Sequence, residues 1–202
     1  MVTPRFTTFE YNLGRATDLV GLGQAVGVMT VGRVDASEMY RSALMLAVGA
    51  FDSYVHGLVL DRGVDIILGR TPASSDDKKI SLHLRGVNEI LTAATPADKE
   101  LAARTFFAER LTAETFQSPD DVGKALAVVG VAKVWSVAFP NAEAAKLRLS
   151  LVVRRRNAIV HQCDADPVSH ANVTPITDQD AVDAIDAIRD TATSIDLHVS
   201  SL

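Results

Sequence analysis

The sequence predicts an all-α fold, a helical bundle with additional short helices. Apolar residues recur at three- and four-residue spacing in most of the chain, residues that start helices precede several of these segments, and no segment alternates apolar and polar residues as a strand would. With 202 residues, 48% of them hydrophobic, the chain can bury a substantial core. We expect one domain, residues 1–202, with an N-terminal helical segment at 1–34, a core at 35–161 and a C-terminal helix at 177–202.

Two long helices and a loop are expected in the first eighty residues. The first helix carries apolar residues at helical spacing over residues 9–29, although its glycines weaken it. The second starts at Asp35-Ala-Ser-Glu38, where an Asp or Ser oxygen can accept the free N–H groups of the first turn, and its apolar stripe extends to Leu58. A short helix is expected within residues 61–70. Proline, serine and paired charges then predict a loop at residues 70–79.

Further helices are expected at residues 80–94, 96–115, 118–139 and 142–161, with a last helix after Thr177. The sequence Ser118-Pro119-Asp120-Asp121 is a helix start, because it supplies an N-cap, a proline in the first helical position and an acidic first turn in that order. Thr177 to Asp180 caps the last helix. The polar stretch 162–175, interrupted by Pro167, separates the last two helices.

Composition limits the function classes. The net charge of −5 argues against a protein that coats nucleic acid through its overall charge, so any RNA contact requires a local basic patch. A single cysteine, Cys163, excludes an internal disulfide framework. The longest apolar run, residues 43–50, is far too short to span a bilayer, and charged residues interrupt the first twenty positions. We therefore expect a cytoplasmic protein that does not use a membrane.

Two motifs suggest cofactor or metal chemistry, and neither is supported by its context. Gly21-Leu-Gly23-Gln-Ala-Val-Gly27 lacks the spacing of a dinucleotide loop and follows no strand, so small residues for helix packing are the better interpretation. Asp52 and His56, four residues apart, have no third ligand at a suitable spacing. We expect no metal and no cofactor. Asp52 is more simply explained as a satisfied acid in or near the core than as a catalytic group.

The most informative segment is Arg154-Arg155-Arg156-Asn157-Ala158-Ile159-Val160-His161, near the end of a late helix. Arginine can hold a phosphate through paired N–H donors, and histidine can exchange a proton near neutral pH. At about 100° per residue, Arg154, Asn157 and His161 share one side of the helix, whereas Arg156 lies about 140° from His161. From the residues alone, a solvated basic helix face remains the simpler interpretation.

The segment Arg156-Asn157-Ala158-Ile159-Val160-His161 resembles the signature of the HEPN superfamily: an arginine, a polar residue, three further residues and a histidine. Its place near the end of a late helix, after an early long helix that contains Ser42 to Val55, makes the chain similar to RiboL-PSP-type HEPN domains over nearly its whole length. Related sequences carry an acidic residue near the position of Asp52. The resemblance implies an all-α fold of the HEPN type.

The resemblance also implies an activity, that of a metal-independent endoribonuclease in which two protomers bring their motif helices together. His161 would act as general base or acid at the ribose 2′-hydroxyl and the leaving 5′-oxygen, and Arg156 would bind the scissile phosphate. Asn157 would orient the histidine or the phosphate by hydrogen bonding. Flanking phosphate affinity would come from three arginines, Arg148, Arg154 and Arg155. Asp52 would be a supporting acid. The apolar residues Leu149, Val153 and Val160 on other faces of the helix are an indirect sign of a homodimer.

Enzymes of this type often belong to toxin–antitoxin, antiviral or RNA-processing systems, and this implies RNA as a partner and a possible cognate inhibitor protein. The main alternative is a non-catalytic, HEPN-like dimeric module for binding or regulation, in which the arginines pair with acidic residues of a partner. A third interpretation is a metal hydrolase built on Asp52, His56 and another histidine. It predicts that a chelator abolishes activity.

Overall fold

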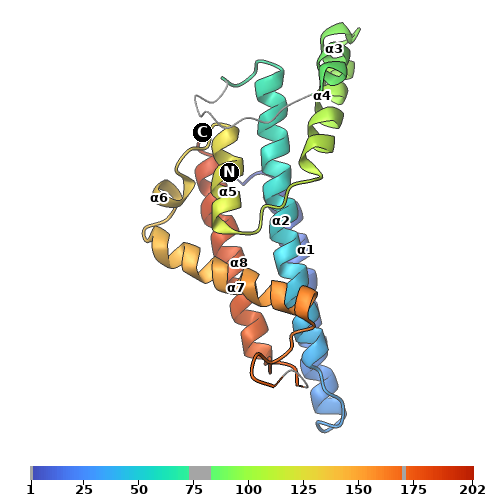
Figure 1. Ribbon diagram of the computed structural model, residues 1–202, viewed down its shortest axis with the longest axis vertical. Coiled ribbons are helices and arrows are strands. Elements are labelled where there is room, and N and C mark those ends of the chain that lie inside the picture. Colours follow the sequence, from blue (N-terminus) through green and yellow to red (C-terminus); the bar gives the residue numbers. More distant parts are fainter. Residues whose placement is uncertain (1, 73–82, 170–171) are drawn as a thin grey trace.

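The computed structural model describes residues 2–72, 83–169 and 172–202 (Figure 1). These residues form eight helices: α1 (Pro4–Met29), α2 (Ser37–Ile67), α3 (Leu84–Thr92), α4 (Pro96–Leu111), α5 (Pro119–Val128), α6 (Val134–Ala138), α7 (Ala142–Gln162) and α8 (Asp178–Val199). Within the described ranges the only extended pairing is an isolated antiparallel bridge between Ala165 and Val173. The all-α prediction is confirmed.

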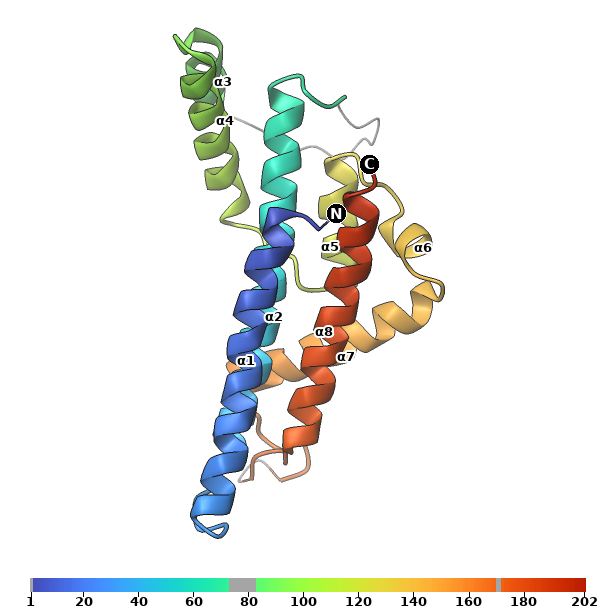
Figure 2. The same cartoon turned by 180° about the vertical axis from the view of Figure 1, so that it is seen from behind.

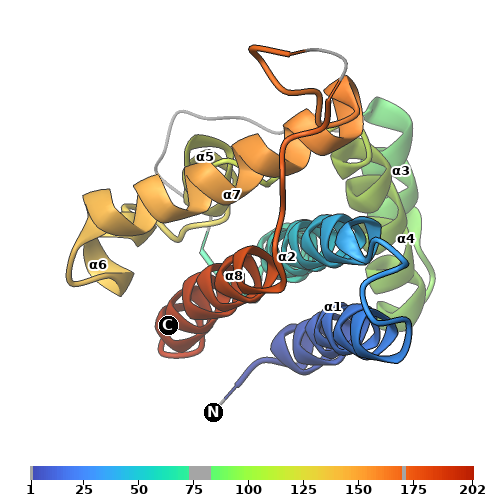
Figure 3. The same ribbon diagram turned by 90° about the horizontal axis from the view of Figure 1, so that it is seen from below.

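The centre of the fold is α2, which contacts α1, α4, α5, α7 and α8. Helices α1 and α8 lie along it, as Figure 2 shows, and α7 runs across α2 and α8 (Figure 3). Side chains of α2 such as Phe51, Val55 and Val59 are completely buried. By length and composition alone α2 could span a membrane, but 61% of its most apolar window is buried inside the fold. Burial between helices is therefore sufficient to explain its apolar sequence.

Side-chain caps set the start of five helices. The side chains of Thr3, Thr95, Ser118, Asn141 and Thr177 each accept a backbone N–H from the first turn of the helix that follows. At Thr177 the cap is reciprocal, because the side chain of the third helical residue also accepts the Thr177 N–H. The helix starts expected at Ser118 and Thr177 are thus present in the structure.

Helix α2 is longer than the sequence pattern indicates. It continues without a break to Ile67, so the short helix expected within residues 61–70 is the end of α2. Asp61 lies in this extension and accepts hydrogen bonds from Arg5 of α1 and Arg104 of α4, which joins three helices. Most of the expected loop at 70–79, from residue 73 on, lies outside the described residues, as do the first three residues of the helix expected at 80–94.

The single helix expected at 118–139 is wrong. The structure has α5 and α6 instead, separated by a turn in which Gly130 has φ of 84° and Lys133 has φ of 56°. A left-handed residue cannot continue an α-helix, so the chain reverses there. The turn returns Trp135 to the start of α5, where its indole N–H donates to the carbonyl of Pro119 at 2.8 Å. This buried hydrogen bond holds the two short helices together.

The N-terminus of α1 is fixed by a buried carboxylate. Asp196 of α8 is 1% exposed and accepts hydrogen bonds from the backbone N–H and the hydroxyl of Thr3 and from the hydroxyl of Tyr54. Burial and the neighbouring carboxylate raise the pKa of Tyr54. Three donors and the positive end of the α1 dipole stabilise the Asp196 carboxylate, which forms no ion pair with the residues that the structure describes. Helices α1, α2 and α8 therefore meet at one polar point.

Glycines let helices approach closely at two places. A Cβ atom on Gly23 would lie 2.7 Å from the ring of Tyr40, so this glycine of the rejected dinucleotide motif serves the packing of α1 on α2. On Gly63 a Cβ would lie 2.0 Å from the ring of Phe107, which is buried between α2 and α4. The Phe107 side chain is 4% exposed, so the ring is enclosed by the fold.

We expect Gly63→Ala to destabilise the fold by about 1–3 kcal/mol, because the added methyl group overpacks a closed interface. Gly49→Ala is the matched control in the same helix. Apart from its chain neighbours and the adjacent backbone of α2, no atom lies within 4 Å of its added Cβ, so this substitution should stabilise the fold by about 0.5–1 kcal/mol through helix propensity. Urea unfolding of both variants measures the difference. Equal stabilities would contradict the close approach at Gly63.

Candidate functional site

The arginine-rich segment lies on the last three turns of α7. Asn141 caps the start of this helix, and Cys163 ends it in a left-handed conformation with φ of 49°. Asp164 follows with φ of 54°, so two consecutive residues turn the chain away from the helix axis. Basic side chains at the carboxyl end also complement the helix dipole.

The three consecutive arginines have different environments. Arg154 is exposed and makes no ion pair with the residues that the structure describes. Arg155 is 25% exposed and donates from Nη2 to Asp164 and to the carbonyls of Thr174 and Pro175. Arg156 is half-buried and donates to Asn157 Oδ1 at 3.0 Å. One of the three is therefore held in the fold, and two present free charge.

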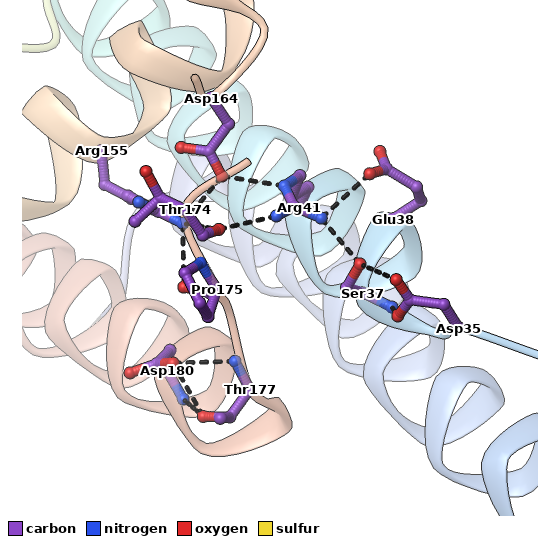
Figure 4. A network of polar contacts seen from close by, with 10 residues as sticks. All are labelled: Asp35, Ser37, Glu38, Arg41, Arg155, Asp164, Thr174, Pro175, Thr177 and Asp180. Carbon is purple, nitrogen blue, oxygen red and sulfur yellow. Dashed lines mark hydrogen bonds and ion pairs between the residues drawn. The ribbon is translucent and has the colours of Figure 1, made fainter. Parts of the chain in front are cut away.

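Arg155 is part of a buried network that the sequence analysis missed (Figure 4). Asp164 is 1% exposed, and its Oδ2 accepts from Arg155 at 2.7 Å and from Arg41 Nε at 2.8 Å. Arg41 also donates to the Thr174 carbonyl at 2.7 Å and to Ser37 Oγ at 2.7 Å. The network connects the start of α2, the end of α7 and the chain leading to α8.

The position of Arg41 in the sequence could have indicated this network. It shares a face of α2 with Leu44 and Val48, both buried, and an arginine on an apolar helix face needs an acid partner. Asp164 could not be identified as that partner from spacing, because 123 residues separate the two. Its Oδ1 has no hydrogen-bond partner among the described residues.

A groove runs beside α7 and includes part of the predicted site. This groove, called the α7 groove below, has a volume of about 1060 Å³, and its walls come from α7, the start of α5 and the chain after Asp164. Arg154, Arg155 and Asn157 line it. Neither Arg156 nor His161 does. The arrangement can hold an anion along α7, at a distance of one helical turn from His161.

Arg156 and His161 do not come together in one chain. Helix α7 is continuous to Gln162, so the separation of about 140° around its axis is retained. His161 is exposed on the last turn, in line with Asn157. A site that uses both an arginine at 156 and a histidine at 161 would thus require the surface of a second chain.

Arg148 is engaged with α8. It donates to Asp190 at 2.5 Å on the surface, where the ion pair is exposed to solvent. Arg148 and Arg155 also line a smaller cavity of about 470 Å³ between α7 and α8, together with Asp180 and Asp183. Acids therefore surround Arg148, in contrast to Arg154.

Asp52 lies in a polar contact between α2 and the chain that joins α4 to α5. Its carboxylate accepts the backbone N–H of Phe116 at 2.6 Å and the side-chain amide of Gln117 at 3.3 Å, and it lies 3.5 Å from His56 Nδ1. Burial would raise the pKa of Asp52, but hydrogen bonds from these three groups lower it below its ordinary value. The hydrogen bond with Asp52 raises the pKa of His56 against the effect of burial. These partners explain Asp52 as a satisfied acid.

No three metal-ligating side chains converge in the part of the chain that the structure describes. Asp52 and His56 have Phe116 as their neighbour, with its ring centroid 4.3 Å from that of the histidine. The metal-hydrolase interpretation therefore has no ligand set at this position among the described residues.

No protein-family model matches this chain, and neither does any curated protein or any solved structure.

Replacing Asp164 should destabilise the fold by about 3 kcal/mol, because it leaves Arg41 charged, buried and without its closest acid. The suitable variant is Asp164→Asn, since asparagine tolerates the left-handed backbone. Arg155→Ala is the comparison and should cost less than half as much, because Arg41 still neutralises Asp164. Denaturant unfolding tests the order, and a greater loss for Arg155→Ala would contradict it.

The Asp52–His56 contact should make stability depend on pH. The raised pKa of His56 contributes stability that is complete below its unfolded value of about 6.5 and is lost as pH rises through the folded value. The lowered pKa of Asp52 contributes stability above its unfolded value of about 3.9, which is lost as pH falls through the folded value.

Thermal unfolding of wild type and His56→Gln across pH 5 to 9 measures the histidine contribution. The advantage of wild type should decrease as the solution becomes alkaline. An advantage that is constant over this range would mean that folding does not raise the pKa of His56, and an advantage that increases with pH would mean that folding lowers it.

Proposed function

We propose that this chain is a metal-independent endoribonuclease that cleaves RNA at Arg156, Asn157 and His161 of α7. The observation that carries the proposal is the environment of these three side chains, namely their exposure and their hydrogen-bond partners. Arg156 donates to Asn157 without an acid partner among the described residues, and His161 is exposed one turn beyond Asn157. A free guanidinium, an amide and a histidine are the groups that transesterification of RNA requires.

In the proposed reaction His161 takes the proton of the ribose 2′-hydroxyl, whose oxygen attacks the adjacent phosphorus. The P–O bond to the 5′-oxygen breaks, and that oxygen receives a proton from water. Arg156 binds the phosphate oxygens and stabilises the charge that develops on them. Asn157 holds Arg156 through its side-chain oxygen. The products are a 2′,3′-cyclic phosphate and a 5′-hydroxyl, and DNA is not a substrate because it lacks the nucleophile.

The site is proposed to form between two copies of the chain, because one helix cannot direct Arg156 and His161 to the same phosphate. Two residues named above as signs of a dimer, Leu149 and Val153, are buried within the chain at 0% and 7% exposure and do not support it. Other α7 side chains do. Leu147 and Val160 are 61% and 42% exposed, so α7 retains apolar side chains outside the groove that a second copy can cover.

A non-catalytic binding module is the second candidate. Arg148 and Arg155 favour it, because both are already paired with acids and so contribute less free charge than a basic RNA-binding helix would. Under this alternative, a partner protein with acidic side chains contacts Arg154 and Arg156. RNA then remains intact in the presence of the purified protein.

An endoribonuclease of this kind would have to be restrained in the cytoplasm where it is made. We therefore place it in a toxin–antitoxin or antiviral setting, with a cognate inhibitor protein that covers α7. The exposed apolar and basic side chains of α7 are a suitable surface for such an inhibitor.

The purified protein should cleave single-stranded RNA equally well with and without EDTA and should leave a 2′,3′-cyclic phosphate end. His161→Ala and Arg156→Ala should each reduce the rate by at least about a hundredfold, since each removes a group that acts on the transition state. Arg110→Ala is a control on α4, where the arginine pairs with Glu114. Cleavage that survives both α7 substitutions would contradict the proposed site.

Mixing the two inactive variants tests the composite site. If each site takes Arg156 from one chain and His161 from the other, a mixed dimer retains one intact site of two, so that an equal mixture should recover about a quarter of the wild-type rate. Neither variant alone should recover activity. A wild-type protein that is active as a monomer in solution would exclude the composite arrangement.

A further inference from the structure

The α7 groove differs from the rest of this acidic protein in its charge. The chain has a net charge of −5, yet the described residues that line the groove include two arginines and no acidic residue. The smaller cavity between α7 and α8 contrasts with it, because Asp180 and Asp183 lie there beside its arginines. A groove with this charge selects an anionic ligand over a cationic one.

The two arginines of the groove have complementary properties. Arg155 is fixed, because its Nη2 donates to Asp164, Thr174 and Pro175, while its Nε and Nη1 have no hydrogen-bond partner among the described residues. Asp164 is shared with Arg41, so it does not belong to Arg155 alone. Arg154 is exposed one residue away. An arginine held by a buried acid loses less entropy when it binds a phosphate, and a free one can adapt to the next phosphate.

The remaining walls combine apolar surface with neutral polar groups. Leu151, Val153 and Pro119 supply apolar contacts, and Ser150, Asn157 and Gln162 supply hydroxyl and amide groups. Unstacked bases of single-stranded RNA need both, since their faces bury against apolar groups or guanidinium planes and their edges form hydrogen bonds. The volume of about 1060 Å³ is comparable with that of the larger small-molecule pockets, up to about 1000 Å³, so the groove has room for a ligand larger than a single anion.

We propose that the α7 groove binds the single-stranded RNA segment that adjoins the scissile phosphate, with Arg154 and Arg155 on its phosphates and the apolar wall against its bases. This inference rests on the proposed ribonuclease function, because Asn157 belongs to both the groove and the candidate site. The inference assigns different roles to the three arginines that flank the candidate site. Arg154 and Arg155 contact RNA, and Arg148, paired with Asp190 among acids, does not.

Binding can be measured without cleavage by using a fluorescent single-stranded RNA whose 2′-hydroxyls are methylated, so that no nucleophile is present. Arg154→Ala should weaken binding roughly tenfold, because it removes a charge-assisted hydrogen bond. It should also reduce the slope of log affinity against log salt concentration by about 0.7. Ser150→Glu should weaken binding at least as much, since it places a carboxylate in the groove.

We expect Ser150→Glu to fold like the wild-type protein, because a glutamate at 150 can pair with Arg154 four residues later in the same helix. A loss of binding in this variant would therefore not result from unfolding. Two controls match the charge changes. Arg148→Ala lies on α7 outside the groove, and Arg15→Ala lies on α1, which does not contact α7. Both should bind the methylated RNA within about twofold of wild type, a range expected for surface charges distant from the ligand.

Equal binding by wild type, Arg154→Ala and Ser150→Glu would overturn the groove assignment, as would duplex RNA or a polyglutamate peptide that binds as tightly as the single strand. The outcome is separable from that of the proposed function. His161-dependent cleavage with unaffected binding in the groove variants rejects the groove alone. Arg154-dependent binding of the methylated RNA without any cleavage of normal RNA rejects the ribonuclease and retains the groove.

Discussion

Helix α2 has apolar side chains on most of its faces and must therefore be covered on most of them. Five other helices contact it, and the largest buried side chains of the core include its Phe51 and Tyr54. Three charged groups of α2 have partners from other elements: Arg41 is paired with Asp164, Asp52 with Phe116 and Gln117, and Asp61 with Arg5 and Arg104. The order of these contacts along α2 fixes where each neighbouring segment attaches.

The arginine run shows how the same residue type serves the fold and the site. A buried arginine stabilises only when an acid and further acceptors satisfy it, and Arg155 has both. Its neighbours on α7 point elsewhere and keep their charge for a ligand. The rotation of about 100° between successive residues is sufficient to produce this division. A count of basic residues in the segment therefore overestimates the charge that is free of internal ion pairs.

Local signals predicted most of the helix starts, since caps such as Ser118 and Thr177 act within one turn. The break between α5 and α6 was not predictable in this way. It depends on the contact of Trp135 with Pro119, and helical spacing continues across the turn. In the candidate site, the face shared by Asn157 and His161 followed from helix geometry. The role of Arg155 did not, because its partners Asp164 and Thr174 are set by tertiary structure.

The return chain between α7 and α8 is attached at both of its ends. Asp164 and the carbonyl of Thr174 accept hydrogen bonds from both Arg41 and Arg155, and Ala165 pairs with Val173. The carbonyl of Pro175 accepts a further hydrogen bond from Arg155. Between these anchors, Val168 is 93% exposed. Chain length beyond the Ala165–Val173 bridge can thus vary without displacing the anchors. A peptide tag or a fluorescent label inserted next to Val168 would therefore leave both attachments of the return chain in place.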